Sequence, residues 1–253
     1  MIRGTWSLNE PLLPANISAI LVRIGQGKGL SQDALLKNTE IDPEAFSDPK
    51  ALLTYKQVII LTNNILTLSN EPTLGLELGQ AININQYGML GYAILSCANV
   101  RQALNLGLKY HVLIDPAFNF EVIDQGELTS VRLTSHIPIE SIYNFLCDVF
   151  LSNFVSLGRF LTGLDISPKT ININRSKPDF SEQFEQFFAG IPISWDQSRT
   201  ELVFDSSLLD APTTLADEAT AKMAESQCAE ILARMGPREG IVVKVRRILL
   251  SKP

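Results

Sequence analysis

The chain has 253 residues, of which 45% are hydrophobic and 19% are charged. A chain of this length hides roughly 70–75% of its extended surface on folding, so it can form a sizeable core. No uninterrupted apolar run approaches the ~18 residues that a membrane helix needs. Three widely spaced cysteines exclude both a disulfide framework and a cysteine zinc site. We expect one large domain or two small ones, and a cytoplasmic location because the N-terminus has no signal-peptide pattern.

The net charge of −6 is unevenly distributed along the chain. Residues 234–253 carry six basic side chains and one acid, whereas the rest of the chain is acidic. An acidic body does not attract nucleic acid by itself. The short basic end is typical of a junction to another segment or of a frayed helix.

The first third of the chain predicts short helices. A helix over 14–25 is stopped by Gly25, Gly27 and Gly29. Thr54 and Gln57 predict a capping box for a further helix, and Pro72 opens a short one. Ser31 and Asp42 are expected N-caps. The segment 31–46 superficially resembles a helix-turn-helix, but its acidic side chains would repel DNA, so a packed helical pair is the alternative.

The middle of the chain mixes helices and strands. A helix over 99–114 is apolar on most sides and is therefore expected to be central. Alternating residues over 118–122 and 128–133 predict a hairpin. A long helix over 140–161 follows, with polar residues along one face.

The last third continues this alternation and ends in helices. A strand over 169–174 and a helix over 179–188 precede a second expected hairpin, formed by 191–195 and 200–204. Helices over 213–235 and 238–250 follow, separated by a break at Gly236 and Pro237. The pattern predicts an α+β fold with a mostly antiparallel sheet.

These patterns suggest three parts of the chain. Residues 1–80 are expected to form a helical subdomain, residues 81–212 an α+β core, and residues 213–253 a helical segment.

No enzyme signature stands out. The spacing of Gly25, Gly27 and Gly29 does not match a dinucleotide-binding loop. With only His111 and His136 present, a multi-histidine metal site is excluded. A pairing of Cys97 with His111 as nucleophile and base has no supporting motif, and a lone cysteine is usually a small buried hydrophobe. We expect no enzyme activity, no cofactor and no metal.

Candidate ligand contacts lie among the aromatic residues of the central part. Ligand sites are mostly apolar with a few polar anchors, so polar-tipped residues between apolar ones are the candidates. His111 is either a hydrogen-bonded core residue or a ligand contact, and Arg132 either anchors an anionic group or faces solvent. The candidate contacts are Tyr92, His111, Arg132, Tyr143 and Trp195.

Three stretches together resemble a known family. They are Gly88–Ser96, with Val100–Leu104 and Tyr110–His111; Ala216–Glu218 through Glu225–Leu232; and Val245–Leu250. Over residues 15–252 their order and spacing are similar to the N-terminal effector-binding and dimerisation region of AraC-type transcriptional regulators, in the subgroup whose domain is labelled arabinose-binding.

This resemblance implies a small-molecule sensor that forms a homodimer and whose parent protein binds DNA through a C-terminal helix-turn-helix module. It makes residues 81–212 the ligand-sensing core and residues 213–253 the dimerisation and linker segment. The sequence ends at Pro253, about where that module would begin, so we expect no direct DNA reading by these residues. The alternatives are a ligand-free interaction module and an uncharacterised enzyme that uses the same pocket.

Overall fold

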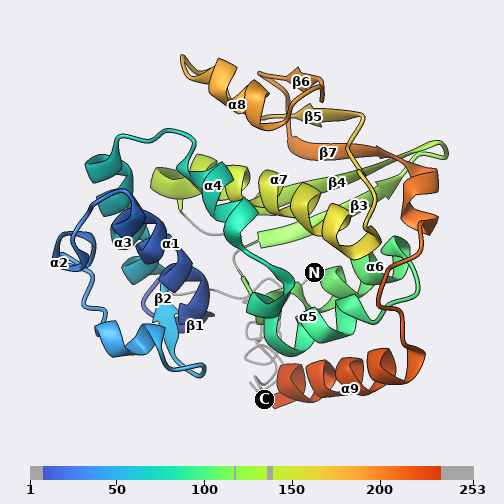
Figure 1. Ribbon diagram of the computed structural model, residues 1–253, viewed down its shortest axis with the longest axis horizontal. Coiled ribbons are helices and arrows are strands. Elements are labelled where there is room, and N and C mark those ends of the chain that lie inside the picture. Colours follow the sequence, from blue (N-terminus) through green and yellow to red (C-terminus); the bar gives the residue numbers. More distant parts are fainter. Residues whose placement is uncertain (1–7, 117, 136–138, 235–253) are drawn as a thin grey trace, which may run out of the picture.

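The computed structural model describes residues 8–116, 118–135 and 139–234. The described residues form a helical unit, a five-stranded sheet and a group of helices that ends in α9 (Figure 1). This confirms the α+β fold. The three-part division at residues 80 and 212 stays a prediction.

The helical unit begins with β1 (Pro11–Pro14) and α1 (Ala15–Gly27), which are followed by the single turn α2 (Gln32–Leu35) and the 3-10 turn η1 (Pro43–Phe46). Strand β2 (Leu52–Thr54) pairs antiparallel with β1, a small sheet that the sequence did not predict. Helices α3 (Tyr55–Ser69) and α4 (Leu74–Ala81) complete the unit. The segment 31–46 therefore has two short turns instead of the two helices of a helix-turn-helix.

The expected helix caps are confirmed. The Ser31 hydroxyl accepts from the backbone N–H of Ala34, and Asp42 caps η1. Thr54 and Gln57 form the capping box that begins α3.

The main sheet has the strand order β3-β4-β7-β5-β6. Its strands are β3 (Phe118–Asp124), β4 (Leu128–Ser135), β5 (Thr170–Asn172), β6 (Ile193–Ser194) and β7 (Thr200–Asp205). The β3–β4 pair is the predicted hairpin, and the β4–β7 and β7–β5 pairs are also antiparallel, which agrees with the predicted mostly antiparallel sheet.

The second expected hairpin is wrong, because β6 pairs in parallel with β5 and not with β7. The connection from β5 to β6 passes through α8 (Ser181–Phe187), a crossover long enough for parallel pairing. After β6, the backbone N–H groups of Asp196 and Gln197 donate to the carbonyls of Arg175 and Ile173. These bonds hold the chain along the β5 side and prevent a tight turn into β7.

The long helix α7 (Glu140–Thr162) runs through the centre of the molecule, between the sheet and α4 (Figure 1). Its residues 141–162 are long and apolar enough to cross a membrane by length and composition alone. Within the fold, however, much of this helix is buried between other elements, which explains its apolar character.

The remaining helices form a third cluster. Helix α5 (Gly88–Leu95) follows the 3-10 turn η2 (Ile84–Tyr87), and α6 (Val100–Tyr110) continues into the 3-10 turn η3 (His111–Leu113). After β7, the 3-10 turn η4 (Ser206–Asp210) leads to α9 (Glu218–Arg234), which packs along α5. The helix expected from residue 213 starts later because Thr213, Thr214 and Asp217 donate backbone bonds to Ala98, Leu161 and Ser96. The expected helix over 238–250 and the break before it lie outside the described residues.

Candidate functional site

A cavity of about 290 Å³ lies where the helical unit, the sheet, α7 and the α5–α6 pair meet. The sheet contributes Phe118 and Phe120 from β3, together with Val131 and Leu133 from β4. These residues share one face because side chains alternate along a strand and β3 and β4 pair in register. The volume is close to the lower end of the range that small-molecule sites occupy.

Successive turns of α7 contain buried polar residues, namely Asp148, Ser152 and Asn153. Of these, Asn153 reaches the cavity. The Asn153 side chain donates to the carbonyls of Gly79 and Ile82, at 2.9 and 2.8 Å, and so satisfies carbonyls at the end of α4. Its side-chain oxygen accepts from the Tyr87 hydroxyl at 2.5 Å. Burial raises the pKa of Tyr87 above its ordinary value, so the hydroxyl stays protonated and remains a donor.

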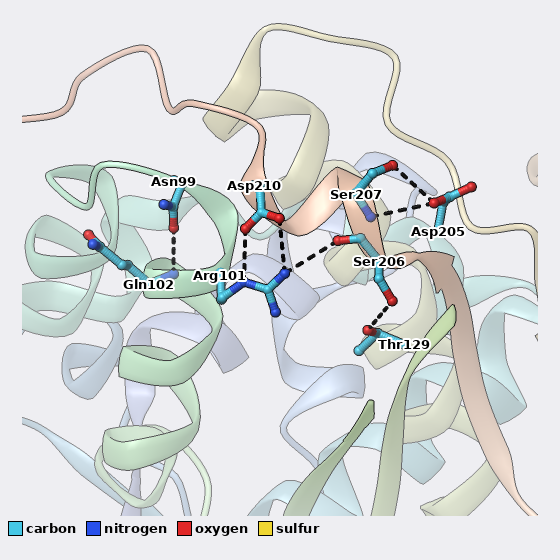
Figure 2. Close-up of polar contacts among 8 residues, drawn as sticks. All are labelled: Asn99, Arg101, Gln102, Thr129, Asp205, Ser206, Ser207 and Asp210. Carbon is cyan, nitrogen blue, oxygen red and sulfur yellow. Dashed lines mark hydrogen bonds and ion pairs between the residues drawn. The ribbon is translucent and has the colours of Figure 1, made fainter. Parts of the chain in front are cut away.

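Helix α6 forms another wall, and a polar network fixes its N-terminal end (Figure 2). The Asn99 side chain caps the helix by accepting from the backbone N–H of Gln102. Arg101 makes a bidentate contact with Asp210 at 2.9 and 3.1 Å. Ser206, on the same segment as Asp210, lies 2.9 Å from the Thr129 hydroxyl of β4. The network therefore ties α6 to η4 and to the sheet.

His111 lies at the other end of α6 and lines the cavity. Its Nδ1 is 2.7 Å from the carbonyl oxygen of Leu108. A carbonyl only accepts, so Nδ1 carries a hydrogen, and in the neutral ring Nε2 is left as an acceptor. The ring meets Phe120 edge to face, with 5.5 Å between centroids. His111 is thus a hydrogen-bonded residue that borders the cavity, and its contact with a ligand stays a prediction.

Thr62 on α3 supplies a hydroxyl to the same cavity. The residue is fully buried, and its Oγ1 makes no hydrogen bond to the described part of the chain. A buried hydroxyl without a partner costs free energy, and ordinary cores avoid it. A molecule in the cavity could supply the missing hydrogen-bond partner of the Thr62 hydroxyl.

The other four candidate contacts do not border this cavity. Tyr92 on α5 is 56% exposed. Arg132 alternates with the lining residues Val131 and Leu133, so it lies on the other face of β4, where it pairs with Glu201. Tyr143 packs on the core from α7, and Trp195 stacks edge to face on Phe184 of α8. Their role in ligand binding stays a prediction, and only His111 is placed at the cavity.

Sequence reasoning missed several polar residues of the lining. Thr62 lies one turn after Val58, on the apolar face of α3 that also carries Leu61 and Ile65, so its position was a usable signal. Asn153 carries no such signal, because its hydrogen-bond partners are all distant in sequence. The missed polar lining residues are Ser18, Thr62, Tyr87, Asp115 and Asn153.

A nucleophilic or metal site finds no support in the described residues. The Cys97 thiol is buried and contacts the Ala93 carbonyl at 3.3 Å. Burial raises the pKa of this thiol, which disfavours the reactive thiolate. Within residues 8–116, 118–135 and 139–234, no group of three or more His, Cys, Asp or Glu side chains is placed to hold a metal ion.

The fold and the cavity together define an α+β domain with a mostly apolar cavity of small-molecule size between its parts. The family model for the N-terminal arabinose-binding domain of AraC transcription regulators matches residues 29–213, and the chain belongs to this family. The family that the sequence motifs resembled is thereby confirmed.

Three relatives are consistent with this membership. The ornithine utilization regulator of Pseudomonas aeruginosa is 29% identical over 242 residues, which are 96% of this chain and 71% of that protein. An uncharacterized HTH-type transcriptional regulator of Mycobacterium bovis is 20% identical over 92% of this chain and 69% of its own length. The crystal structure of the transcriptional regulator CdpR from Pseudomonas aeruginosa shares the fold, with a TM-score of 0.62 at 16% identity over 94% of this chain and 71% of that chain.

Proposed function

We propose that this domain senses a small molecule for a bacterial AraC-type transcription regulator and that the molecule binds in the cavity between α6, α7, the sheet and the helical unit. The observation that carries the proposal is the cavity itself, in a chain whose family and relatives are transcription regulators. In this proposal the domain acts in the cytoplasm without enzyme activity, associates with a second copy, and leaves DNA contact to a separate helix-turn-helix module.

The size of the cavity supports a ligand over a purely structural role. Volume that side chains leave unfilled costs roughly 24 cal/mol per Å³. A space of about 290 Å³ is much larger than the voids that packed protein interiors usually leave. A ligand that fills the space offsets this cost, whereas an interaction module would gain nothing from it.

Gly107 offers a direct test. It lines the cavity from α6, and a Cβ at this position would meet only the Ile94 side chain, at 3.5 Å. Gly107→Leu should fill part of the cavity and lower the affinity for small molecules at least about tenfold, while Gly107→Ala adds helix propensity with little volume.

The measurement is mass spectrometry of small molecules released from each purified protein, together with reporter transcription driven by the complete regulator. We expect the wild type and Gly107→Ala to release a molecule that Gly107→Leu lacks, and the effector response to be lost only in Gly107→Leu. An unchanged response in a folded Gly107→Leu protein would place the sensing site elsewhere.

A further inference from the structure

The lining of the cavity points to the chemistry of its ligand. We infer that the cavity takes an uncharged, mostly hydrocarbon molecule with one or two hydrogen-bonding groups, and neither a sugar nor a charged amino acid. This inference rests on the proposed function, because it names the class of molecule that the sensing site would bind.

Hydrocarbon dominates the walls on every side. The α7 wall includes Phe145, Phe150 and Phe154, and rings of the sheet and of α7 contact one another, with Phe120 and Phe150 centroids 5.4 Å apart. Leu and Ile side chains from α1, α4, α5 and α6 line other parts of the cavity. Such walls favour apolar surface and offer no partner to most polar atoms of a ligand.

Most of the polar side chains in the lining already have partners inside the protein. Both amide hydrogens of Asn153 go to backbone carbonyls, and its oxygen accepts from Tyr87. The Asp115 carboxylate accepts from the Tyr55 hydroxyl. These groups hold the walls in place and have little hydrogen-bonding capacity left for a ligand.

A small set of polar atoms stays available to a ligand. The Thr62 hydroxyl is fully buried without a partner, and neither His111 Nε2 nor the Ser18 hydroxyl makes a hydrogen bond within the described ranges. Each of these groups accepts or donates one or two bonds, which suits a hydroxyl or a carbonyl on the ligand.

A sugar fits this set poorly. A pentose carries four or more oxygen atoms around a small ring, and each would lose its bonds to water on entering the cavity. Every hydroxyl left without a partner there opposes binding. The Ser18 hydroxyl, the Thr62 hydroxyl and His111 Nε2 are too few to bond all the hydroxyl groups of such a ring.

A charged amino acid fits no better. Ornithine carries one carboxylate and two ammonium groups, and burying a charge is costly unless it is paired. Among the described residues that line the cavity there is no lysine or arginine to pair with a carboxylate. The acid of the lining, Asp115, already serves the Tyr55 hydroxyl.

The experiment compares defined probes by isothermal titration and by thermal unfolding. The probes are the 1-alkanols from 1-butanol to 1-decanol, octanoate and octylamine as charged molecules of one length, L-arabinose, and L-ornithine. We expect the alkanols to bind, with affinity rising roughly fourfold per added methylene until the cavity is full. Arabinose, ornithine and the two charged octyl compounds should bind at least about tenfold more weakly than 1-octanol.

Two variants show where the probes bind. Gly107→Leu should remove alkanol binding, with Gly107→Ala as its matched control. Thr62→Val keeps the shape of the side chain but removes the hydroxyl, so 1-octanol affinity should fall about two- to tenfold. The same variant should leave the binding of benzene, which has no hydroxyl, unchanged. If Gly107→Leu fails to fold, the contrast between 1-octanol and benzene in Thr62→Val decides the question.

Several results would overturn the inference, and they differ in what they say of the proposed function. Arabinose or ornithine binding that Gly107→Leu abolishes, without alkanol binding, would keep the sensing site and refute the apolar ligand. Octanoate or octylamine binding more tightly than 1-octanol would refute the uncharged ligand. Equal alkanol binding to wild type and Gly107→Leu would place these molecules outside the cavity. The proposed function itself fails only if the effector response survives in the folded Gly107→Leu regulator.

Discussion

Asp148 is a carboxyl group buried in the middle of α7, with Arg175 as its partner. Two guanidinium nitrogens lie 3.0 and 3.1 Å from its two oxygens. The same guanidinium lies over the rings of Phe184 and Trp195, so the pair is held in apolar surroundings. Burial raises the pKa of Asp148 to about 7, and the opposing effect of Arg175 only partly compensates. The charge of this one residue in the central helix therefore changes with pH near neutrality.

This raised pKa predicts a stability that falls as the pH rises. Between the ordinary value of 3.8 and about 7, the folded protein holds a proton that the unfolded chain has released. The free energy of unfolding should therefore decrease with pH across this window, by at most about 1.4 kcal/mol per pH unit. Urea unfolding of wild type and Asp148→Asn between pH 4 and 8 measures this effect. Identical slopes in the two proteins would show that Asp148 does not titrate there.

At the residue scale, the sequence predicted one residue that lines the cavity. His111 was a candidate because it is a polar-tipped residue among apolar ones, and the structure places it in the cavity lining. Arg132 was ambiguous for a physical reason, since alternation along a strand does not say which face meets the ligand. Its pairing with Glu201 depends on the register of β4 with β7, which brings together residues 69 positions apart. Tertiary pairing of this kind leaves no local pattern.

At the scale of elements, two glycines set how closely α4 and α7 pack. A Cβ at Gly75 would lie 2.6 Å from the Phe145 carbonyl oxygen, and a Cβ at Gly79 would lie 2.0 Å from Ser152 Oγ and 2.3 Å from the Val149 carbonyl oxygen. Backbone atoms cannot move away without shifting α7. The cavity walls that α4 and α7 contribute therefore depend on these glycines.

Gly79→Ala should accordingly destabilise the protein, by about 1–3 kcal/mol, because overpacking forces the helices apart. Gly27→Ala is a matched control, since a Cβ at Gly27 at the end of α1 meets no atom within 4 Å. The control should be neutral or stabilising by up to about 1 kcal/mol. Chemical denaturation compares the two variants, and equal stabilities would contradict this account of the α4–α7 contact.

Most elements of the fold were predictable because their signals are local. The capping box at Thr54 and the alternation of β3 and β4 each lie within a few residues of sequence. The failures concern pairing at a distance. The parallel β5–β6 pair and the small β1–β2 sheet join segments separated by about 20 and 40 residues, and neither contact is visible in a local pattern.

At the scale of the whole molecule, α9 is only partly buried. Ala224 and Cys228 are buried against α5, so this helix does pack on its own domain. Other apolar side chains of α9 stay accessible: Met223 is 61% exposed, and Ile231, two turns after Ala224, is 42% exposed. We propose these exposed side chains as part of the self-association surface, in keeping with the homodimer expected for the regulator.

Met223→Glu should weaken self-association by placing a charge in an apolar contact, with a rise of at least about tenfold in the dimer dissociation constant. Leu68→Glu is the control, because Leu68 is a similarly exposed apolar residue on α3, away from α9. Size-exclusion chromatography with light scattering over a range of concentrations measures both. A wild-type protein that is monomeric at every concentration, or a Leu68→Glu variant that dissociates equally, would argue against the α9 surface.

The position of α5 would couple ligand binding in the cavity to the proposed self-association through α9. Leu90 and Ile94 on this helix border the cavity, while its contact with α9 lies on the same short element. If a ligand changes the affinity between two protomers by some factor, thermodynamic linkage requires a reciprocal effect. Association of the protomers then changes their affinity for the ligand by the same factor. The effector concentration that switches such a regulator would then depend on how much of the regulator the cell contains. The same effector concentration would therefore switch a larger or smaller fraction of the regulator, depending on whether the regulator is abundant or scarce.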